Sequence, residues 1–168
     1  MGHRIVPRAQ DRLAPGRPVA QLAAVASVDG LLTQNGIRYW LFGGWAVDFY
    51  AGTITRAHDD VDIAVSLGDH DGIAALLARE GWVHAPEPDE EGGTGYEREG
   101  VRLELTFLEQ VPWPADAFGA DRRELEGVGA NLVSLAALRR GKASARDEPG
   151  DAAKDRADAA TLAVLGET

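Results

Sequence analysis

The amino-acid sequence predicts an α/β or α+β fold, in which helices flank a small mixed β-sheet. Short runs with an apolar residue at every second position, as in strands, are interleaved with longer runs whose apolar residues recur at helical spacing. A length of 168 residues and the absence of an internal repeat suit one domain. We therefore expect a loose, charged N-terminal arm over residues 1–17 and a single domain over 18–168, with C-terminal helices from about residue 134.

The first half of the domain is predicted to alternate helices and strands. Leu22, Val25 and Leu32 fall on one helical face, and Gly36 is expected to end that helix. The predicted elements are a helix over 19–35, a strand over 39–42, a short helix over 45–50 and a second strand over 60–65.

The second half is predicted to begin with a helix through Glu80, for which Asp69 is the expected N-cap. An acidic, glycine-rich stretch over 86–95 is expected to be a loop, and Gly100 is expected to turn a hairpin. The remaining predicted elements are strands over 82–85, 96–99 and 101–108, and helices over 135–140 and 152–165 joined by a charged loop that contains Pro149 and Gly150.

Composition limits the classes of function that the chain suits. The net charge is −10 and there is no cysteine, which excludes disulfides, a zinc–thiolate site and a cysteine nucleophile. The acidic balance opposes a large nucleic-acid interface and better suits a polycationic small molecule. No apolar run is long enough for a transmembrane helix, and the N-terminus lacks the apolar segment of a secretory signal. We therefore expect a cytoplasmic protein whose partners include neither a membrane nor a nucleic acid.

Two carboxylates lie one residue apart in the predicted strand over 60–65. Residues two apart in a strand share a face and lie about 6.5–7 Å apart, so Asp60 and Asp62 are expected to point the same way, opposite to Val61 and Ile63. The two like charges repel each other, and a divalent cation between them would reverse the sign of that interaction. Oxygen ligands suit Mg²⁺ or Mn²⁺, often shared with substrate phosphates. The alternative is an acidic strand face exposed to solvent.

The hairpin strand over 101–108 repeats this pattern. Its apolar residues share one face, while Arg102 and Glu104 share the other. If the two strands are neighbours, Glu104 joins Asp60 and Asp62 in one cluster, and three carboxylates make a two-metal site possible. The alternative is that Glu104 pairs with Arg102 on a solvent-exposed hairpin.

Gly43 and Gly44 lie where a predicted strand runs into a predicted helix. Two glycines at this junction present backbone N–H groups without a Cβ in the way, and the N-terminus of a helix favours anions. A phosphate group is therefore a candidate ligand here. The sequence matches neither the P-loop nor the dinucleotide-binding fingerprint, and on its own a glycine pair can be a simple turn.

These residues together form a pattern that is more specific than its parts. It reads Gly43-Gly44-Trp-Ala-x-Asp, then Gly52, then Thr55-Arg56-x-His58-x-Asp60-x-Asp62, followed by the acidic strand. This pattern, over residues 39–108, closely resembles the nucleotidyltransferases of the polymerase-beta-like superfamily. It is most similar to the small antibiotic-modifying enzymes, the aminoglycoside 2''-adenylyltransferases and lincosamide nucleotidyltransferases. A weaker similarity is Lys154-Asp155-x-x-Asp158 near the C-terminus. The resemblance implies the nucleotidyltransferase fold.

The resemblance also implies a role for each matching residue. Glu104 stands where the family has its third carboxylate, often Asp, and would bind a second metal ion or take the proton from the acceptor hydroxyl. For Arg56 and His58, bracing the loop before the metal-binding strand is an equal alternative to contact with the ligand. The implied catalytic and metal-binding residues are Asp60, Asp62 and Glu104, and the implied nucleotide-binding residues are Gly43, Gly44, Arg56 and Lys154.

The activity implied by the resemblance is a metal-dependent transfer of AMP from ATP to a hydroxyl of a small molecule, an aminoglycoside or lincosamide antibiotic. The acidic loop 87–91 and Glu97 are candidates for a wall that attracts ammonium groups, and Trp82, Tyr96 and Trp113 for the floor of a sugar site. Three alternatives stay open: a nucleotidyltransferase that modifies a protein or an RNA, as in toxin–antitoxin systems, a relative that binds nucleotide without catalysis, and a metal site without nucleotide.

Overall fold

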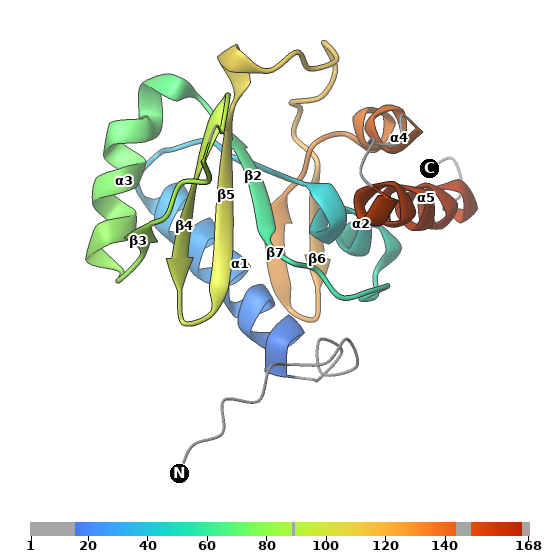
Figure 1. Ribbon diagram of the computed structural model, residues 1–168, viewed down its shortest axis with the longest axis horizontal. Helices are drawn as coiled ribbons and strands as arrows, with labels where there is room; N and C mark the ends of the chain where they lie inside the picture. The colour runs from blue at the N-terminus through green and yellow to red at the C-terminus, as the bar shows by residue number, and fades with distance from the viewer. Residues whose placement is uncertain (1–15, 89, 144–148, 166–168) are drawn as a thin grey trace.

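The computed structural model describes residues 16–88, 90–143 and 149–165 (Figure 1). Five strands form the main sheet, in the order β1-β2-β5-β4-β3, and β6 and β7 form a separate hairpin. The strands are β1 (Trp40–Phe42), β2 (Val61–Val65), β3 (Val83–His84), β4 (Gly93–Arg98), β5 (Val101–Phe107), β6 (Arg122–Leu125) and β7 (Val128–Asn131). The helices are α1 (Gly16–Gln34), α2 (Gly43–Ala51), α3 (His70–Arg79), α4 (Leu135–Ala143) and α5 (Pro149–Val164), with short 3-10 turns at Leu67–Asp69 and Leu108–Gln110.

The sheet is mixed, as the sequence predicts. β2 runs parallel to β5, while β1 is antiparallel to β2 and β4 is antiparallel to β5. In this register Asp62 lies opposite Glu104 and Val61 lies opposite Leu103. The two strands that the sequence marks as acidic on one face are therefore direct neighbours.

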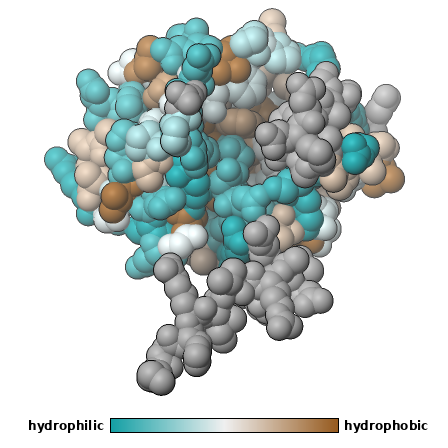
Figure 2. Space-filling view, in the orientation of Figure 1, coloured by the Kyte–Doolittle hydropathy of each residue, from teal (hydrophilic) through white to brown (hydrophobic). Residues whose placement is uncertain are grey.

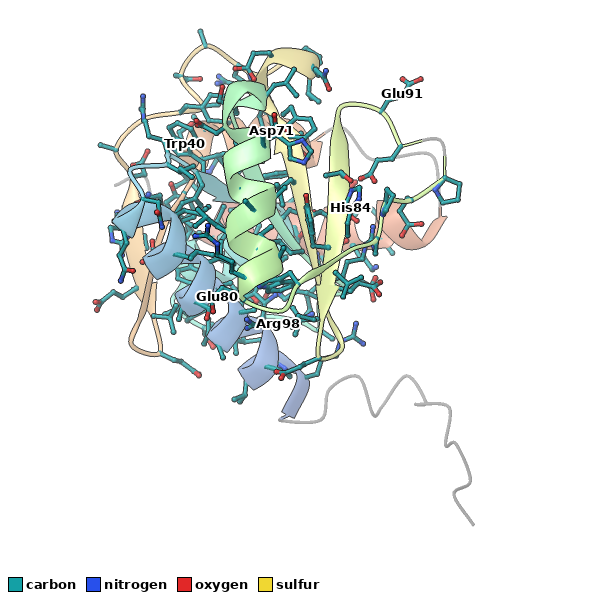
Figure 3. All side chains as sticks on the ribbon, turned by 90° about the vertical axis from the view of Figure 1, so that its left-hand side faces the viewer. Trp40, Asp71, Glu80, His84, Glu91 and Arg98 are labelled. Carbon is teal, nitrogen blue, oxygen red and sulfur yellow. The ribbon has the colours of Figure 1, made fainter. Side chains whose placement is uncertain are left out.

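Alternation along β5 follows the prediction residue by residue. Its apolar side chains at 101, 103, 105 and 107 are buried, whereas Arg102, Glu104 and Thr106 are only half-buried. In Figure 1, α1 passes behind the sheet and α3 stands at its left, and the turned view of Figure 3 shows α3 in front of the strands. A fully buried set of large side chains fills the interior between these layers, and includes Leu32, Leu41, Ile63, Ile73, Leu103 and Leu105.

Two predicted boundaries are wrong for local physical reasons. β4 begins at Gly93, inside the predicted loop, because Gly93 pairs with Thr106 and has no side chain to collide with β5: a Cβ there would lie within 3.0 Å of the Leu105 carbonyl oxygen. Pro149 begins α5 instead of lying in a loop, since proline is well suited to the first turn of a helix. Asp69 is the N-cap residue of α3, as predicted, although its side chain makes no capping hydrogen bond.

The β6–β7 hairpin was not predicted. Its residues show little apolar alternation, and the exposed residues Arg122 and Arg123 dominate β6. Tertiary contacts hold it in place. Arg122 donates two hydrogen bonds of 2.9 Å to Asp29 in α1, and the Asn131 backbone N–H donates to the Tyr39 hydroxyl at 3.1 Å.

The predicted N-terminal arm lies outside the described residues except for its last two, which begin α1. The face of the molecule seen in Figure 2 is mostly hydrophilic, with hydrophobic side chains in small scattered groups. In the described part of the chain, no helix has both the length and the apolar character needed to cross a membrane.

Candidate active site

One pocket of about 570 Å³ contains most of the residues that the sequence marks for function. It lies where the ends of β1 and β2 meet α2, α4 and α5. Its polar wall consists of Gly43, Gly44, Arg56, His58, Asp59, Asp60, Asp62, Lys154 and Asp155. Its apolar wall consists of Phe42, Val111, Trp113, Val133, Ala137 and Leu138.

Asp62 lies directly against the start of α2. Gly43 begins this helix with a φ of 71°, a left-handed conformation that glycine adopts without strain. A Cβ on Gly43 would lie 2.5 Å from the Asp62 carboxylate oxygen Oδ2. Only a residue without a side chain therefore allows the Asp62 carboxylate to approach the helix N-terminus this closely.

Gly44 is covered by two nitrogen-bearing side chains. A Cβ on Gly44 would lie within 3.0 Å of both His58 Nδ1 and Arg56 Nη2. His58 is almost fully buried, and its Nδ1 has no hydrogen-bond partner among the described residues. The two glycines thus bring the helix N-terminus into contact with a carboxylate on one side and with an imidazole and a guanidinium on the other.

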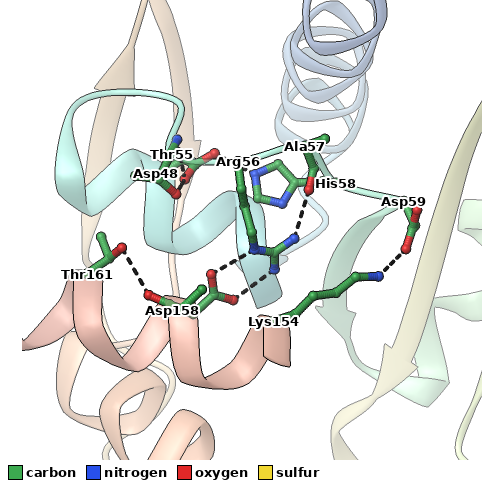
Figure 4. A network of polar contacts seen from close by, with 10 residues as sticks. Asp48, Thr55, Arg56, Ala57, His58, Asp59, Lys154, Asp158 and Thr161 are labelled. Atoms are coloured by element: carbon green, nitrogen blue, oxygen red, sulfur yellow. Dashed lines mark hydrogen bonds and ion pairs between the residues drawn. The ribbon is translucent and has the colours of Figure 1, made fainter. Parts of the chain in front are cut away.

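Asp48 is a site residue that sequence reasoning overlooked. Its carboxylate is fully buried in α2 and accepts three hydrogen bonds: from the Thr55 backbone N–H at 3.1 Å, from the Thr55 hydroxyl at 2.5 Å, and from His58 Nε2 at 2.5 Å. Figure 4 shows these side chains beside Arg56. The signal was present, since Asp48, Thr55 and His58 all belong to the recognised pattern, but their mutual contact depends on the fold.

A second buried contact ties the same loop to α1. The Gln21 side-chain amide donates to the His58 carbonyl at 2.9 Å, and Trp45 Nε1 donates to the Gln21 side-chain oxygen at 3.2 Å. His58 is therefore held through its ring by α2 and through its backbone by α1. Because Asp60 follows two residues later, these contacts fix the backbone at the start of β2.

α5 closes one side of the pocket through two ion pairs with this loop. Arg56 donates to both carboxylate oxygens of the buried Asp158, and Lys154 donates to Asp59 (Figure 4). Burial lowers the pKa of Arg56, but the hydrogen bond and charge of Asp158 outweigh it and the pKa is raised. Arg56 and Lys154 both line the pocket while holding α5 in place. Within the weakly similar segment, Lys154 and Asp158 thus contact the loop, and Asp155 is buried and lines the pocket.

Glu104 does not line this pocket. Although it lies opposite Asp62 in the sheet, its carboxylate accepts a hydrogen bond of 2.5 Å from Arg102 Nε. The pKa of Glu104 is raised to about 7, chiefly by burial and also by the neighbouring Glu90, while Arg102 acts in the opposite direction. Among the described residues, no three His, Cys, Asp or Glu side chains are grouped closely enough to hold a metal ion. Glu104 thus pairs with Arg102, as the alternative expects, but its side chain is largely buried and not exposed to solvent. Its role as a metal ligand or a base stays a prediction.

The residues predicted for the acidic wall and the aromatic floor do not come together around one site in the structure. Glu87 and Glu97 lie 3.3 Å and 3.2 Å from Arg102, outside the pocket, and are largely exposed. Trp82 and Tyr96 are buried in the core and do not reach the pocket. Trp113 does line it, in edge-to-face contact with Phe42 at a ring-centroid distance of 5.2 Å.

The donor set of the polar wall suits a hard divalent cation. Asp60 and Asp62 both line the pocket and offer carboxylate oxygens beside the helix N-terminus. Mg²⁺ is commonly held by one or two carboxylates together with substrate phosphates, so two aspartates are sufficient. The two aspartates therefore fit a cation whose other ligands would come from a phosphate-bearing substrate.

The amino-acid sequence also matches a known family. A sequence model of the aminoglycoside-2''-adenylyltransferase family matches residues 24–110, which is more than half of the 168 residues. No curated protein sequence matches the chain. The matched segment runs from α1 to the end of β5 and contains Gly43, Gly44, Asp60, Asp62 and Glu104.

The fold is that of nucleotidyltransferases of known structure. The solution structure of the antibiotic-resistance factor ANT(2'')-Ia is 20% identical over 88% of this chain and 89% of that one, with a TM-score of 0.68. A crystal structure of ANT(2'')-Ia in complex with adenylyl-2''-tobramycin is 19% identical over 87% and 94%, also with a TM-score of 0.68. The lincosamide antibiotic adenylyltransferase LnuA, lincomycin-bound, is 17% identical over 82% and 92%, with a TM-score of 0.63. Likeness at these identities shows the fold, and it confirms the predicted fold class.

Proposed function

The chain belongs to the aminoglycoside-2''-adenylyltransferase family and is thus a nucleotidyltransferase, and on that premise we propose that it transfers AMP from ATP to a hydroxyl of an aminoglycoside antibiotic. The observation that carries this proposal is the convergence of Gly43, Gly44, Asp60 and Asp62 on one pocket. A helix N-terminus with unobstructed glycines binds phosphates, and two adjacent carboxylates bind the cation that accompanies them.

The proposed reaction is an in-line displacement at the α-phosphorus of ATP. The acceptor oxygen forms a bond to that phosphorus, the bond to the β-phosphate oxygen breaks, and pyrophosphate leaves. Catalysis of such transfers consists mainly of positioning and charge neutralisation. A divalent cation supplies charge neutralisation on the triphosphate when it is bound.

The chain's own residues have distinct parts in this proposal. Asp60 and Asp62 hold the cation, and the backbone N–H groups at Gly43 and Gly44 hold phosphate oxygens. Lys154 and Arg56 line the same pocket and supply positive charge near the triphosphate. Their ion pairs with Asp59 and Asp158 hold the two cationic side chains at the pocket wall. The same ion pairs partly neutralise the positive charge of these side chains.

Glu104 is proposed as the general base for the acceptor hydroxyl. A pKa of about 7, raised by burial, allows a carboxylate to take a proton at neutral pH more readily than an ordinary glutamate does. Arg102 already occupies one carboxylate oxygen of Glu104, and Glu104 does not line the pocket, which favours the base role over a third metal-ligand role. The base role requires the acceptor hydroxyl to come within hydrogen-bond reach of the Glu104 carboxylate.

An aminoglycoside suits the charge of the chain. The net charge is −10, and the exposed carboxylates of Glu87 and Glu97 lie beside Glu104 on the same acidic surface. Ammonium groups of an aminoglycoside are attracted to such a surface. Modification of the antibiotic hydroxyl would then confer resistance, and the expected location of the enzyme is the cytoplasm, where ATP is available.

Incubation of the purified chain with ATP, MgCl₂ and a panel of aminoglycosides and lincosamides tests the proposal. Mass spectrometry should detect an antibiotic that has gained one AMP unit, and the product should disappear when EDTA replaces MgCl₂. Asp60→Ala and Asp62→Ala should each abolish product formation while their circular-dichroism spectra stay unchanged. Asp116→Ala is a suitable control, because Asp116 is exposed and lies outside the pocket.

Three outcomes would contradict specific parts of the proposal. Product formation by Asp60→Ala or Asp62→Ala at the wild-type rate would remove the metal assignment. Adducts on lincosamides alone would replace the aminoglycoside as acceptor. If neither class of antibiotic gains AMP although Mg-ATP binds, the acceptor assignment fails while the nucleotide site stands.

A further inference from the structure

Trp113 reaches the pocket wall from outside the recognised pattern. It lies in the loop after the 3-10 turn at Leu108–Gln110, within an aromatic group formed with Phe42 and Phe118, at ring-centroid distances of 5.2 Å and 5.1 Å. Both of these contacts are edge-to-face, with interplanar angles of 81° and 67°. The packing of Phe42 and Phe118 fixes the orientation of the indole ring.

The indole N–H of Trp113 is an unused hydrogen-bond donor. The nitrogen is buried and has no hydrogen-bond partner among the described residues. A buried donor without an acceptor destabilises a protein, so such groups usually have a partner that arrives with a ligand or a water molecule. A ligand that enters the pocket and presents an acceptor atom would remove this cost.

The apolar wall continues directly from the phosphate end of the pocket. Phe42 immediately precedes Gly43, so the aromatic surface begins one residue before the glycines. Val133, two residues after β7, and Leu138 in α4 complete the apolar side. A single molecule with an anionic end and a flat, uncharged end fits such a two-sided cavity.

We propose that Trp113 and Phe42 form the nucleobase subsite of this enzyme, with the Trp113 indole N–H donating a hydrogen bond to a ring nitrogen of adenine. This assignment rests on the proposed function, since it requires a nucleotide whose phosphates lie at Gly43 and Gly44. Aromatic side chains bind bases by stacking against their faces. Adenine also carries ring nitrogens that accept hydrogen bonds but lack a charge of their own.

A nucleobase is better suited to this wall than an aminoglycoside. The ammonium groups of that antibiotic are donors only, and opposite an indole N–H they would leave two donors facing each other. They would also lose hydration against Val133 and Leu138, whereas the carboxylates of the pocket lie on its polar wall. The acidic surface around Glu87 and Glu97 lies elsewhere and is suited to that role.

Comparing two ligands separates the contribution of the nucleobase to binding from that of the phosphates. Dissociation constants for Mg-ATP and Mg-tripolyphosphate are measured by calorimetry for the wild-type chain, Trp113→Ala and Trp113→Phe. Trp113→Ala should weaken Mg-ATP binding by about 10- to 100-fold, the range of base–aromatic stacking. Trp113→Phe keeps one aromatic ring for stacking but loses the five-membered ring with its N–H, so a smaller loss of about two- to tenfold is expected. Binding of Mg-tripolyphosphate should stay unchanged in both variants.

Fluorescence provides a second readout and a matched control. The chain has four tryptophans. Trp82 is buried under the Arg98 guanidinium, 4.8 Å from its ring, and lies outside the pocket. Mg-ATP should quench the emission of the wild-type chain and of Trp82→Phe, and this quenching should be lost in Trp113→Phe.

The outcomes separate the subsite from the proposed function. If the wild-type chain binds neither Mg-ATP nor Mg-tripolyphosphate, the proposed function fails and the subsite fails with it. If both ligands bind and the Trp113 variants weaken them equally, or weaken neither, only the nucleobase assignment is overturned. A raised KM for the antibiotic with unchanged Mg-ATP binding would likewise overturn it and assign Trp113 to the acceptor.

Discussion

Arg56 and Asp158 are joined by two hydrogen bonds, 2.9 Å from Nε to Oδ1 and 2.8 Å from Nη2 to Oδ2, although 102 positions separate them in the sequence. The Asp158 side chain is 1% exposed and that of Arg56 is 20% exposed. This pair fastens α5 to the loop that leads into β2. The position of Lys154 in the pocket wall depends on the same attachment, because Lys154 lies one turn earlier in α5.

We expect Asp158→Ala to lower the free energy of unfolding by about 2–4 kcal/mol, because it leaves the Arg56 guanidinium without its carboxylate in a partly buried position. Loosening of α5 should also raise the dissociation constant of Mg-ATP. Denaturant unfolding and calorimetry measure the two effects. The exposed pair Asp116–Arg140, with side chains 60% and 54% exposed, is the matched control. Asp116→Ala should cost less than about 1 kcal/mol, and equal effects of the two substitutions would contradict the assignment.

Gly44 tests how closely the pocket is packed around the helix N-terminus. Gly44→Ala would place a methyl group within 3.0 Å of His58 Nδ1 and Arg56 Nη2. We expect a loss of stability of about 1–3 kcal/mol, because buried His58 has little room to move, and weaker binding of Mg-ATP. At Gly72 in α3, a methyl group would have no neighbouring atom within 4 Å. Gly72→Ala should therefore be neutral or stabilising by up to about 1 kcal/mol. Thermal melts of both variants measure these changes in stability, and equal melting temperatures would contradict the close packing around Gly44.

Asp48 should be a positioning residue for the loop before β2. Asp48→Ala leaves the Thr55 N–H, the Thr55 hydroxyl and His58 Nε2 without their buried acceptor, and we expect a loss of about 2–4 kcal/mol in denaturant unfolding. Thr55→Val removes only one of these donors and should cost about 1 kcal/mol. A smaller effect for Asp48→Ala than for Thr55→Val would show that the carboxylate is not the centre of the network.

The stability of the metal-free chain should depend on pH through Glu104. Burial raises the pKa of Glu104 from 4.5 to about 7 in the folded state, with help from Glu90 and opposition from Arg102. The folded state therefore holds this proton more tightly than the unfolded chain does. The stabilising contribution is complete below the unfolded pKa of 4.5 and is lost as the pH rises through about 7.

Glu104→Gln removes this titration while keeping the shape of the protonated side chain. In EDTA, the free energy of unfolding of the wild-type chain should fall between pH 5 and pH 8 relative to that of Glu104→Gln. Both proteins share the other titrating groups, so the difference between the two pH profiles reports Glu104. Parallel profiles would contradict a raised pKa at this position.

The sequence alone determined the elements that carry the chemistry. Strict alternation in β5 and the Asp60–Asp62 spacing were enough to predict strands with a dry face and an acidic face, because a strand's side chains alternate by geometry alone. Gly43 and Gly44 marked the start of α2 for a similarly local reason, since glycine alone tolerates both the left-handed φ and the close approach of Asp62. The recognised pattern named the family from these short-range features.

Only the tertiary structure decided which partners these residues meet. The Asp60–Asp62 pair and the glycines converge on one pocket, whereas Glu104, opposite Asp62 in the sheet, turns to Arg102. Asp48 and His58 both belong to the recognised pattern, but their contact, like that of Arg56 with Asp158, 102 positions away, depends on the fold. Side-chain pairing between distant segments depends on how the helices pack against the sheet, and periodicity along the chain does not encode that packing.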